Sequence, residues 1–264
     1  MDFTDEQIER YARHIVLPEV GGIGQARLLR SSVLVVGAGG LGSPLLLYLA
    51  AAGVGRIGVV DDDVVSLSNL QRQIAHDESV LDRPKVESAR ATLARINPDV
   101  VVEPHACRIT PDNVAELIAD YDLVCDGSDN FDTRFLLNDA CYLGRRTLVS
   151  AAVLRFDGQL SVYKAHQGAP HPCYRCLFPE PPPPDLIPSC AEGGVLGAMA
   201  GVMGSLQATE ALKELLQVGD SLSGHLLIYD GLGTQFRRVS IRRDPGCALC
   251  GDDPRITDLS AHAA

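Results

Sequence analysis

Basic residues are scarce in this sequence relative to acidic ones. The 264 residues include 23 Lys and Arg against 34 Asp and Glu, which gives a formal net charge of −11 at pH 7. Nucleic acids are held chiefly by lysine and arginine side chains that neutralise phosphates. The charge balance therefore argues against DNA or RNA as a partner.

The N-terminus lacks the features of an export signal, and the uncharged stretch in the second half of the chain is short for a membrane span. A signal peptide needs a basic start and an apolar run, whereas MDFTDEQIERYARH carries four acidic side chains. The uncharged stretch 195–209 is rich in Gly and Ala and is shorter than the roughly 20 apolar residues of a membrane-spanning helix. We therefore expect a cytoplasmic protein that does not enter a membrane.

What the chain does have is the composition of a globular protein. Apolar residues make up 46% and charged residues 22%, whereas disordered chains combine low hydrophobicity with high charge. The length suits one large α/β domain and is too short for two full-sized ones.

Strand-like and helix-like patterns alternate along the first half of the chain. The run SSVLVVGAGGLGSPLLLYLAAAGVGRIGVVDDD predicts a strand, a glycine turn, a helix and a second strand. Such alternation predicts a Rossmann-like, mostly parallel sheet with helices on both faces. The expected strands are 33–36, 56–60, 100–103, 123–125 and 147–152. The first expected helix follows the glycine turn and ends near 52, and the others span 85–96, 113–119 and 132–143.

The pattern changes after residue 157. Adjacent strand-like runs, RFDGQLSVYKA among them, predict that the sheet continues with antiparallel strands. The tract PEPPPPDLIP predicts an exposed, extended crossover, because proline lacks a backbone donor and fixes φ. A long helix near 195–217 and strands near 226–229 and 236–241 should follow.

The segment GAGGLG points to a nucleotide site. Gly37, Gly39 and Gly42 lie between a predicted strand and helix, where glycine allows a tight turn and lets phosphates approach backbone N–H groups. Asp61 ends the next strand, where an acidic side chain can accept hydrogen bonds from a ribose. A turn with a purely structural role is the alternative, and these residues alone say only that the ligand is an adenine nucleotide.

A polar and cationic segment follows Asp61. It places Asn69, Arg72, Gln73 and Lys85 near the same crevice. Displacement at the phosphorus of ATP needs such cations, because negative charge spreads onto the leaving group, whereas hydride transfer does not need them. The alternative for Arg72 and Lys85 is that they are solvated surface cations.

A carboxylate in CDGSDNFDTR completes this expected site. Asp129 follows a predicted parallel strand, and open α/β sheets bind ligands at the carboxyl ends of their strands. Mg²⁺ prefers one or two carboxylates together with phosphates and waters. We predict that Asp129 binds Mg²⁺, and we expect Asp126 and Asp132 to be a loop carboxylate and a helix cap.

Two CxxC pairs predict a structural zinc site. Cys173 and Cys176 form CYRC, and Cys247 and Cys250 form CALC. Four thiolates suit tetrahedral Zn²⁺ with no open position, and the cytosol keeps thiols reduced. The metal would join two distant loops and constrain the unfolded chain. The alternative is two unrelated pairs of thiols.

The motifs GAGGLGSP, DDDVVSLSNLQRQ, RPKVESA, CYRC, PSCAEGGVLG, GVMGSLQATEALK and PGCALCG occur in this order. With them, the sequence closely resembles the MoeB/ThiF/HesA family, the bacterial relatives of ubiquitin-activating enzymes, over about residues 11–251. The resemblance implies a single adenylation domain over 1–264. Its expected parts are a helical arm (1–30), a Rossmann-like part (31–155), antiparallel strands with the crossover and the zinc site (156–251), and a tail (252–264).

The resemblance also implies a reaction. A homodimer would bind ATP and Mg²⁺ and join AMP to the C-terminal Gly-Gly carboxylate of a small ubiquitin-like sulfur carrier protein, releasing pyrophosphate. A carboxylate with a pKa of roughly 3.5 is ionised at neutral pH and needs no general base. The enzyme has to align the carboxylate with the α-phosphorus and to supply cations that stabilise the negative charge. A sulfur donor would act afterwards, which makes a sulfurtransferase a candidate partner.

Roles of individual residues follow from the family's motifs. Arg13 in RYARHI matches an arginine that reaches the ATP of the other subunit, although by itself it looks like a surface helix residue. Lys85 would bind phosphate and Asp129 would hold Mg²⁺. The implied contacts to ATP are Gly40, Asp61, Asp63, Ser68, Asn69, Leu70, Gln71, Arg72, Gln73, Lys85, Asp129 and Asn130.

The remaining cysteines fall into two groups. Cys190 in IPSCAEGG matches the family's catalytic cysteine and precedes a predicted helix, whose N-terminus lowers a thiol pKa. A chemical role and an inherited, idle thiol both remain open for it. Cys107, Cys125 and Cys141 lie in strand or helix patterns and are expected in the core.

The pathway and two rival classes of function also remain open. SLSNLQRQ and RPKVESAR favour molybdopterin synthesis, and thiamine thiazole synthesis is the alternative. An NAD-dependent oxidoreductase would share the glycine turn and Asp61 but would leave Arg72, Lys85 and the CxxC pairs without a role. A zinc-stapled binding scaffold would leave the cations without one.

Overall fold

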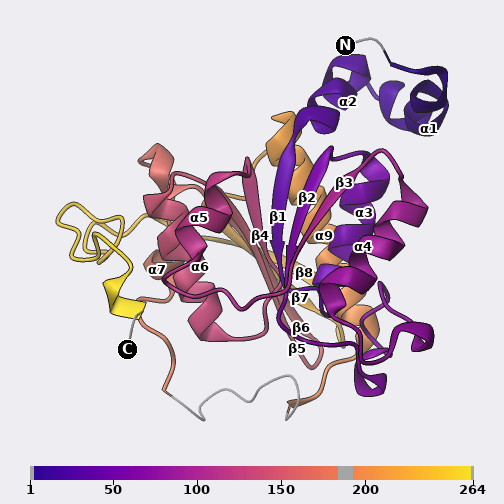
Figure 1. Cartoon of the computed structure of the whole chain (residues 1–264). Helices are drawn as coiled ribbons and strands as arrows, with labels where there is room; N and C mark the ends of the chain where they lie inside the picture. Colours follow the sequence, from indigo (N-terminus) through magenta and orange to yellow (C-terminus); the bar gives the residue numbers. More distant parts are fainter. Residues whose placement is uncertain (1–2, 184–192, 263–264) are drawn as a thin grey trace.

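The computed structural model describes residues 3–183 and 193–262, and its centre is one eight-stranded sheet (Figure 1). The strand order is β3-β2-β1-β4-β5-β6-β7-β8. Neighbours from β3 to β5 pair in parallel, and neighbours from β5 to β8 pair antiparallel. This confirms the predicted architecture. The strands are β1 (Ser32–Val36), β2 (Arg56–Val60), β3 (Val101–His105), β4 (Leu123–Asp126), β5 (Thr147–Leu154), β6 (Asp157–Tyr163), β7 (His225–Asp230) and β8 (Gln235–Ser240).

Helices cover both faces of the parallel strands, as predicted. On one face α3, α4 and α9 bury the larger core, and on the other α5, α6 and α7 bury a second one (Figure 1). No helix in the described part of the chain is long and apolar enough to cross a membrane. The helices are α1 (Asp5–Ile15), α2 (Gly21–Arg30), α3 (Gly42–Ala52), α4 (Lys85–Ile96), α5 (Val114–Ala119), α6 (Phe131–Leu143), α7 (Tyr174–Leu177) and α9 (Gly197–Leu216), with short 3-10 turns at Leu67–Asn69, Glu78–Val80, Ala165–Gln167 and Ser260–His262.

The long helix α9 packs directly against α3, next to the glycine turn. Gly204 makes this close approach possible, because a Cβ at this position would collide with the carbonyl oxygen of Leu41. Gln207, which is fully buried, donates hydrogen bonds to the carbonyl oxygens of Asp126 (2.7 Å) and Val149 (2.9 Å). The helix is therefore fixed to the carboxyl end of β4, where a ligand site would lie, and to the neighbouring strand β5.

The N-terminal helices α1 and α2 lie beyond the end of the sheet at which β1 begins (Figure 1). Thr4 and Gln7 form a capping box that starts α1. The arm is anchored by Tyr11, a buried side chain whose hydroxyl accepts a hydrogen bond from Asn97 Nδ2 at 2.8 Å. This placement separates α1 from the carboxyl ends of the parallel strands.

The two CxxC pairs come together in space although they are far apart in the chain. All four sulfur atoms lie within 4.8 Å of one another. The distances from Cys173 Sγ to Cys247 Sγ and from Cys176 Sγ to Cys250 Sγ are 3.6 and 3.4 Å. A tetrahedron with Zn–S bonds of about 2.3 Å has edges of about 3.8 Å. The four thiols therefore fit one zinc ion with no open position.

We predict that the purified protein holds about one zinc ion per chain at these four cysteines. Cys250→Ser should lose most of the metal and lower the melting temperature, because the ion joins two loops whose closure is costly in the unfolded chain. Elemental analysis and thermal unfolding measure both effects. Cys107→Ser, outside the cluster, is the control and should keep its zinc. Freshly reduced wild-type protein without zinc would contradict the assignment.

Candidate functional site

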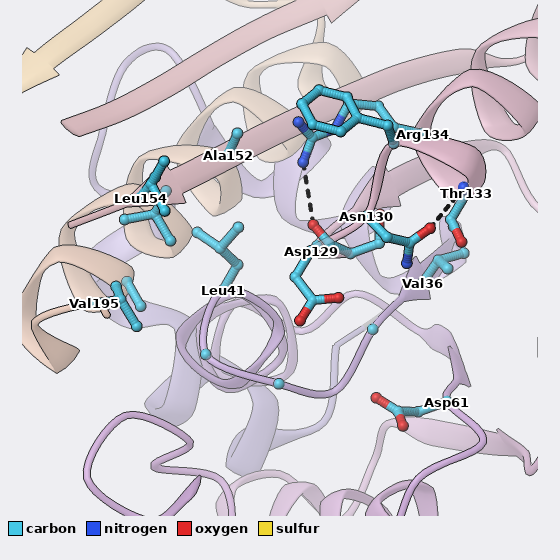
Figure 2. Close-up of a pocket in the computed structure, with 18 of the residues that line it drawn as sticks. Val36, Leu41, Asp61, Asp129, Asn130, Thr133, Arg134, Ala152, Leu154 and Val195 are labelled. Atoms are coloured by element: carbon cyan, nitrogen blue, oxygen red, sulfur yellow. Dashed lines mark hydrogen bonds between the residues drawn. The ribbon is translucent and has the colours of Figure 1, made fainter. Parts of the chain in front are cut away.

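A cavity of about 950 Å³ opens at the carboxyl ends of the parallel strands. Figure 2 shows that its wall is built from separate parts of the chain, with Leu41 beside the glycine turn, Asp61 after β2, Asp129 after β4 and Leu154 at the end of β5. Open α/β sheets bind ligands at this edge. The volume is in the range of small-molecule and cofactor sites.

The glycine turn has the tight geometry that the sequence predicts. Gly37 adopts a φ of 95°, a left-handed conformation that favours glycine. Gly42 packs beneath it, so closely that a Cβ would collide with the carbonyl oxygen of Gly37. Gly37, Gly39 and Gly40 line the cavity, whereas Gly42 supports the turn from the first residue of α3.

Asp61 joins the glycine turn to the segment that follows β2. Its Oδ2 accepts a hydrogen bond from the backbone N–H of Ala38 (2.8 Å), and its Oδ1 accepts one from that of Asp63 (2.9 Å). Asp61 lines the cavity and is half-buried. It therefore holds the turn in shape as well as facing the ligand space, a structural part that the sequence did not indicate.

The structure brings the predicted cationic residues to the same cavity. Arg72 and Lys85 both line it, and Lys85 is only 5% exposed. Lys85 Nζ lies 2.6 Å from Asp63 Oδ2, and Arg72 Nη1 donates to the carbonyl oxygen of Ser68 at 3.2 Å. The buried Oε1 of Gln73 has no hydrogen-bond partner among the described residues. These groups form a cationic and polar wall beside the glycine turn.

Asp129 points into the cavity from the loop between β4 and α6 (Figure 2). Within the described part of the chain no hydrogen bond or ion pair engages its carboxylate. Asn130 also lines the cavity and is the N-cap of α6, where its Oδ1 accepts from the N–H of Thr133 at 2.9 Å. Asp129 is thus free to bind a cation.

Two expectations for this loop were wrong. Asp126 is not a loop carboxylate: it ends β4, is fully buried, and its Oδ2 accepts from Arg134 Nε (3.3 Å) and Ser150 Oγ (2.7 Å). The cap of α6 is Asn130 and not Asp132, because the helix begins one residue earlier than predicted. Arg134, which lines the cavity behind Asp129, is a residue that sequence reasoning missed.

Several predicted residues do not line this cavity. Ser68 and Asn69 belong to a 3-10 turn beside it, and Leu70 and Gln71 follow that turn. Arg13 is exposed on α1, beyond the opposite end of the sheet (Figure 1). Cys190 lies outside the described residues, so its role stays a prediction.

The three other cysteines differ in environment. Cys125 and Cys141 are buried in the core as expected, and burial raises the pKa of both thiols. The expectation for Cys107 was wrong, because this residue follows the end of β3, is half-buried and lines the cavity. Burial also raises the pKa of the Cys107 thiol, so it is no thiolate at neutral pH.

The cavity extends from the glycine turn onto the antiparallel strands. Ala152, Gln159, Ile228 and Arg237 line this second end. They form one row across the sheet, because the register pairs them from β5 through β6 and β7 to β8. This row continues the cavity wall across three antiparallel strand pairs.

Comparisons with known proteins give the chain its relatives. A sulfur carrier protein adenylyltransferase from Thermus thermophilus is 51% identical over 100% of this chain and 98% of its own length. The bovine adenylyltransferase and sulfurtransferase MOCS3 is 54% identical over 96% of this chain, which spans only 55% of that protein. The SAMP-activating enzyme E1 of Haloferax volcanii is 51% identical over 93% of this chain and 90% of its own length.

Solved structures show the same fold. The crystal structure of E. coli MccB with MccA-N7isoASN superposes with a TM-score of 0.80 at 19% identity, covering 92% of this chain and 74% of that one. The family model of the ThiF family matches residues 11–249, most of the chain. By this match and by relatives about half identical along nearly its whole length, the chain belongs to the ThiF family.

Proposed function

We propose that the chain is an adenylyltransferase that joins AMP from ATP to the C-terminal carboxylate of a small ubiquitin-like sulfur carrier protein. One observation carries the proposal: a glycine turn, two cationic side chains and a carboxylate that has no partner among the described residues face one cavity. The name of the Thermus thermophilus relative supports it. The same name supports an enzyme over a zinc-stapled scaffold without catalysis.

The cavity suggests how ATP binds. The glycine turn and the N-terminus of α3 offer backbone N–H groups to phosphates. Asp61 lies at the end of β2, where a ribose would be held. Lys85 and Arg72 line the same wall and would neutralise the triphosphate. A nicotinamide enzyme would have no use for these two cations.

Asp129 fits a magnesium ion because it is a single carboxylate, unpaired within the described residues and aimed into the cavity. Mg²⁺ is commonly bound by one or two carboxylates together with substrate phosphates. When bound, the ion would neutralise charge that develops on the phosphates. Asn130, next to it, fixes the start of α6 and so the position of the loop.

The carrier's tail would enter over the antiparallel strands. Ala152 and Ile228 are short or apolar side chains on this part of the wall, and a terminal Gly-Gly has no side chains to clash with them. One oxygen of the ionised carboxylate attacks the α-phosphorus, the bond from that phosphorus to the oxygen of the β-phosphate breaks, and pyrophosphate leaves with the electron pair. The product is an acyl-adenylate that a sulfur donor can attack.

The pathway is a further part of the proposal. We propose molybdopterin synthesis, with the thiamine thiazole pathway as the alternative, because the segments around Arg72 and Lys85 resemble the molybdopterin branch. We also propose a cytoplasmic homodimer that works with a sulfurtransferase. MOCS3, whose name includes a sulfurtransferase, is nearly twice as long as the part that this chain matches.

The first test is ATP–pyrophosphate exchange with candidate carrier proteins. Labelled pyrophosphate should enter ATP only when a carrier ending in Gly-Gly is present, because the reverse reaction needs the acyl-adenylate. The carrier that supports exchange identifies the pathway. Removal of its last glycine is the control and should abolish exchange. Exchange without any carrier, or with none of the candidates, would contradict the proposal.

Asp129→Ala should abolish exchange while the chain stays folded, because the triphosphate charge is left without its cation. Asp132→Ala is the matched control: this carboxylate is exposed, lies three residues away and does not line the cavity. Exchange rates and thermal unfolding curves measure the two variants. Near-normal exchange by Asp129→Ala would show that the magnesium assignment is wrong.

Arg13 tests the shared site of the proposed homodimer. Arg13→Ala and Asp129→Ala should each be nearly inactive, yet a mixture that exchanges subunits should regain up to about a quarter of wild-type activity. Random pairing makes half of the dimers mixed, and each mixed dimer has one complete site of two. The position of α1, beyond the far end of the sheet, is consistent with a reach into a neighbour. No recovery after confirmed subunit exchange rules out the shared site.

A further inference from the structure

Lys85 and Asp63 form an ion pair whose two partners differ sharply in exposure. Lys85 Nζ lies 2.6 Å from Asp63 Oδ2, yet the lysine side chain is 6% exposed and the aspartate side chain 62% exposed. A second link fixes the backbones, since the N–H of Lys85 donates to the carbonyl oxygen of Asp63 at 3.0 Å. The cation is fixed in place, whereas the anion borders solvent.

Burial makes a counter-ion necessary for Lys85. An ammonium group taken out of water without a partner is strongly destabilising, so some anion must face it at all times. In the chain alone this anion is Asp63, and both residues line the nucleotide end of the cavity. The hydrogen bond from Lys85 lowers the pKa of Asp63, which is therefore charged at neutral pH.

The surroundings of Asp63 allow its carboxylate to leave. Among the described residues, its side chain accepts only one hydrogen bond besides that of Lys85, a local one from the N–H of Val64 to Oδ1 at 3.0 Å. A side chain this exposed regains water when it rotates away from the lysine. Lys85, at the buried first residue of α4, has no comparable alternative. An incoming anion would therefore replace Asp63 at a fixed ammonium group.

We propose that Asp63 is a displaceable counter-ion, which neutralises Lys85 while the nucleotide site is empty and yields that place to a phosphate oxygen of ATP. The inference rests on the proposed function, because it takes Lys85 as a phosphate ligand. Asp63 holds Lys85 in its binding position beforehand, which reduces the reorganisation on binding. Its return would favour the departure of the phosphate. The affinity for ATP is therefore lower than it would be without a counter-ion to displace, but Lys85 is already in its binding position when ATP arrives.

Asp63→Asn tests this by removing the charge and keeping the shape. Calorimetric titration with ATP, without carrier and with EDTA to remove Mg²⁺, should show a dissociation constant roughly two- to fivefold lower than in the wild type. Asp62→Asn is the matched control. Asp62 is the adjacent exposed carboxylate of the same cavity and is not paired with Lys85. Its replacement should have the smaller effect of removing a distant charge.

Two further measurements separate the inference from a general change of charge. In a Lys85→Met background Asp63→Asn should no longer tighten ATP binding, because its effect acts through the lysine. Without ATP, Asp63→Asn should melt at a lower temperature than the wild type, and saturating ATP should narrow the gap.

The outcomes distinguish this inference from the proposed function. If the wild type binds ATP but Asp63→Asn binds it equally or more weakly in EDTA, Asp63 orients Lys85 and is not displaced, and the inference is overturned alone. An equal gain in the Lys85→Met background overturns it too. If the wild type binds no ATP, the proposed function fails and the inference fails with it.

Discussion

The candidate site depends on one buried carboxylate, that of Asp126 at the end of β4. Oδ1 accepts from the N–H and the hydroxyl of Ser128, and Oδ2 accepts from Arg134 and Ser150. These contacts tie β4 to β5, to the loop that carries Asp129 and to α6. Removing one partner of such a buried pair typically costs about 3–5 kcal/mol. The contacts of Asp126 therefore hold the loop in place. The carboxylate of Asp129, which faces the cavity, does not need a partner to fix the loop.

The elements that carry a strong local pattern could be predicted from the sequence. The observed bounds of β2 and α4 agree with those expected, and the glycine turn lies where its motif places it. The four-cysteine site, which includes Cys173 and Cys247, could be predicted because two CxxC pairs have the spacing of structural zinc ligands. Hydrophobic periodicity and motifs depend on residues that are close in sequence. Predictions based on them therefore need no knowledge of tertiary contacts.

The rest depends on contacts between distant segments. DGSDN contains two carboxylates, and nothing local says that Asp126 is buried against Arg134 while Asp129 stays free. In the sequence Cys107 resembles a core residue. In the structure it follows the end of β3 and therefore lies on the cavity wall. Asp63 is similar. Its partner, Lys85, is twenty-two residues away, and only the fold shows that the lysine is buried while the aspartate is exposed.

The cysteine cluster is linked to the same cavity through α7. This short helix has Cys173 as its N-cap and contains Cys176, and Arg175 within it is ion-paired with the fully buried Asp139 at 2.7 Å. Burial raises the pKa of Asp139, but hydrogen bonds from His262 and Arg175 lower it more, and the net shift is downward. Tyr174, the neighbour of Arg175, lines the cavity and packs edge-on against Phe135 of α6. The helix that zinc would hold is thus also part of the cavity wall. A closed metal site can therefore influence the cavity without touching its ligand, because the helix that contains Cys176 also holds Tyr174 in the cavity wall.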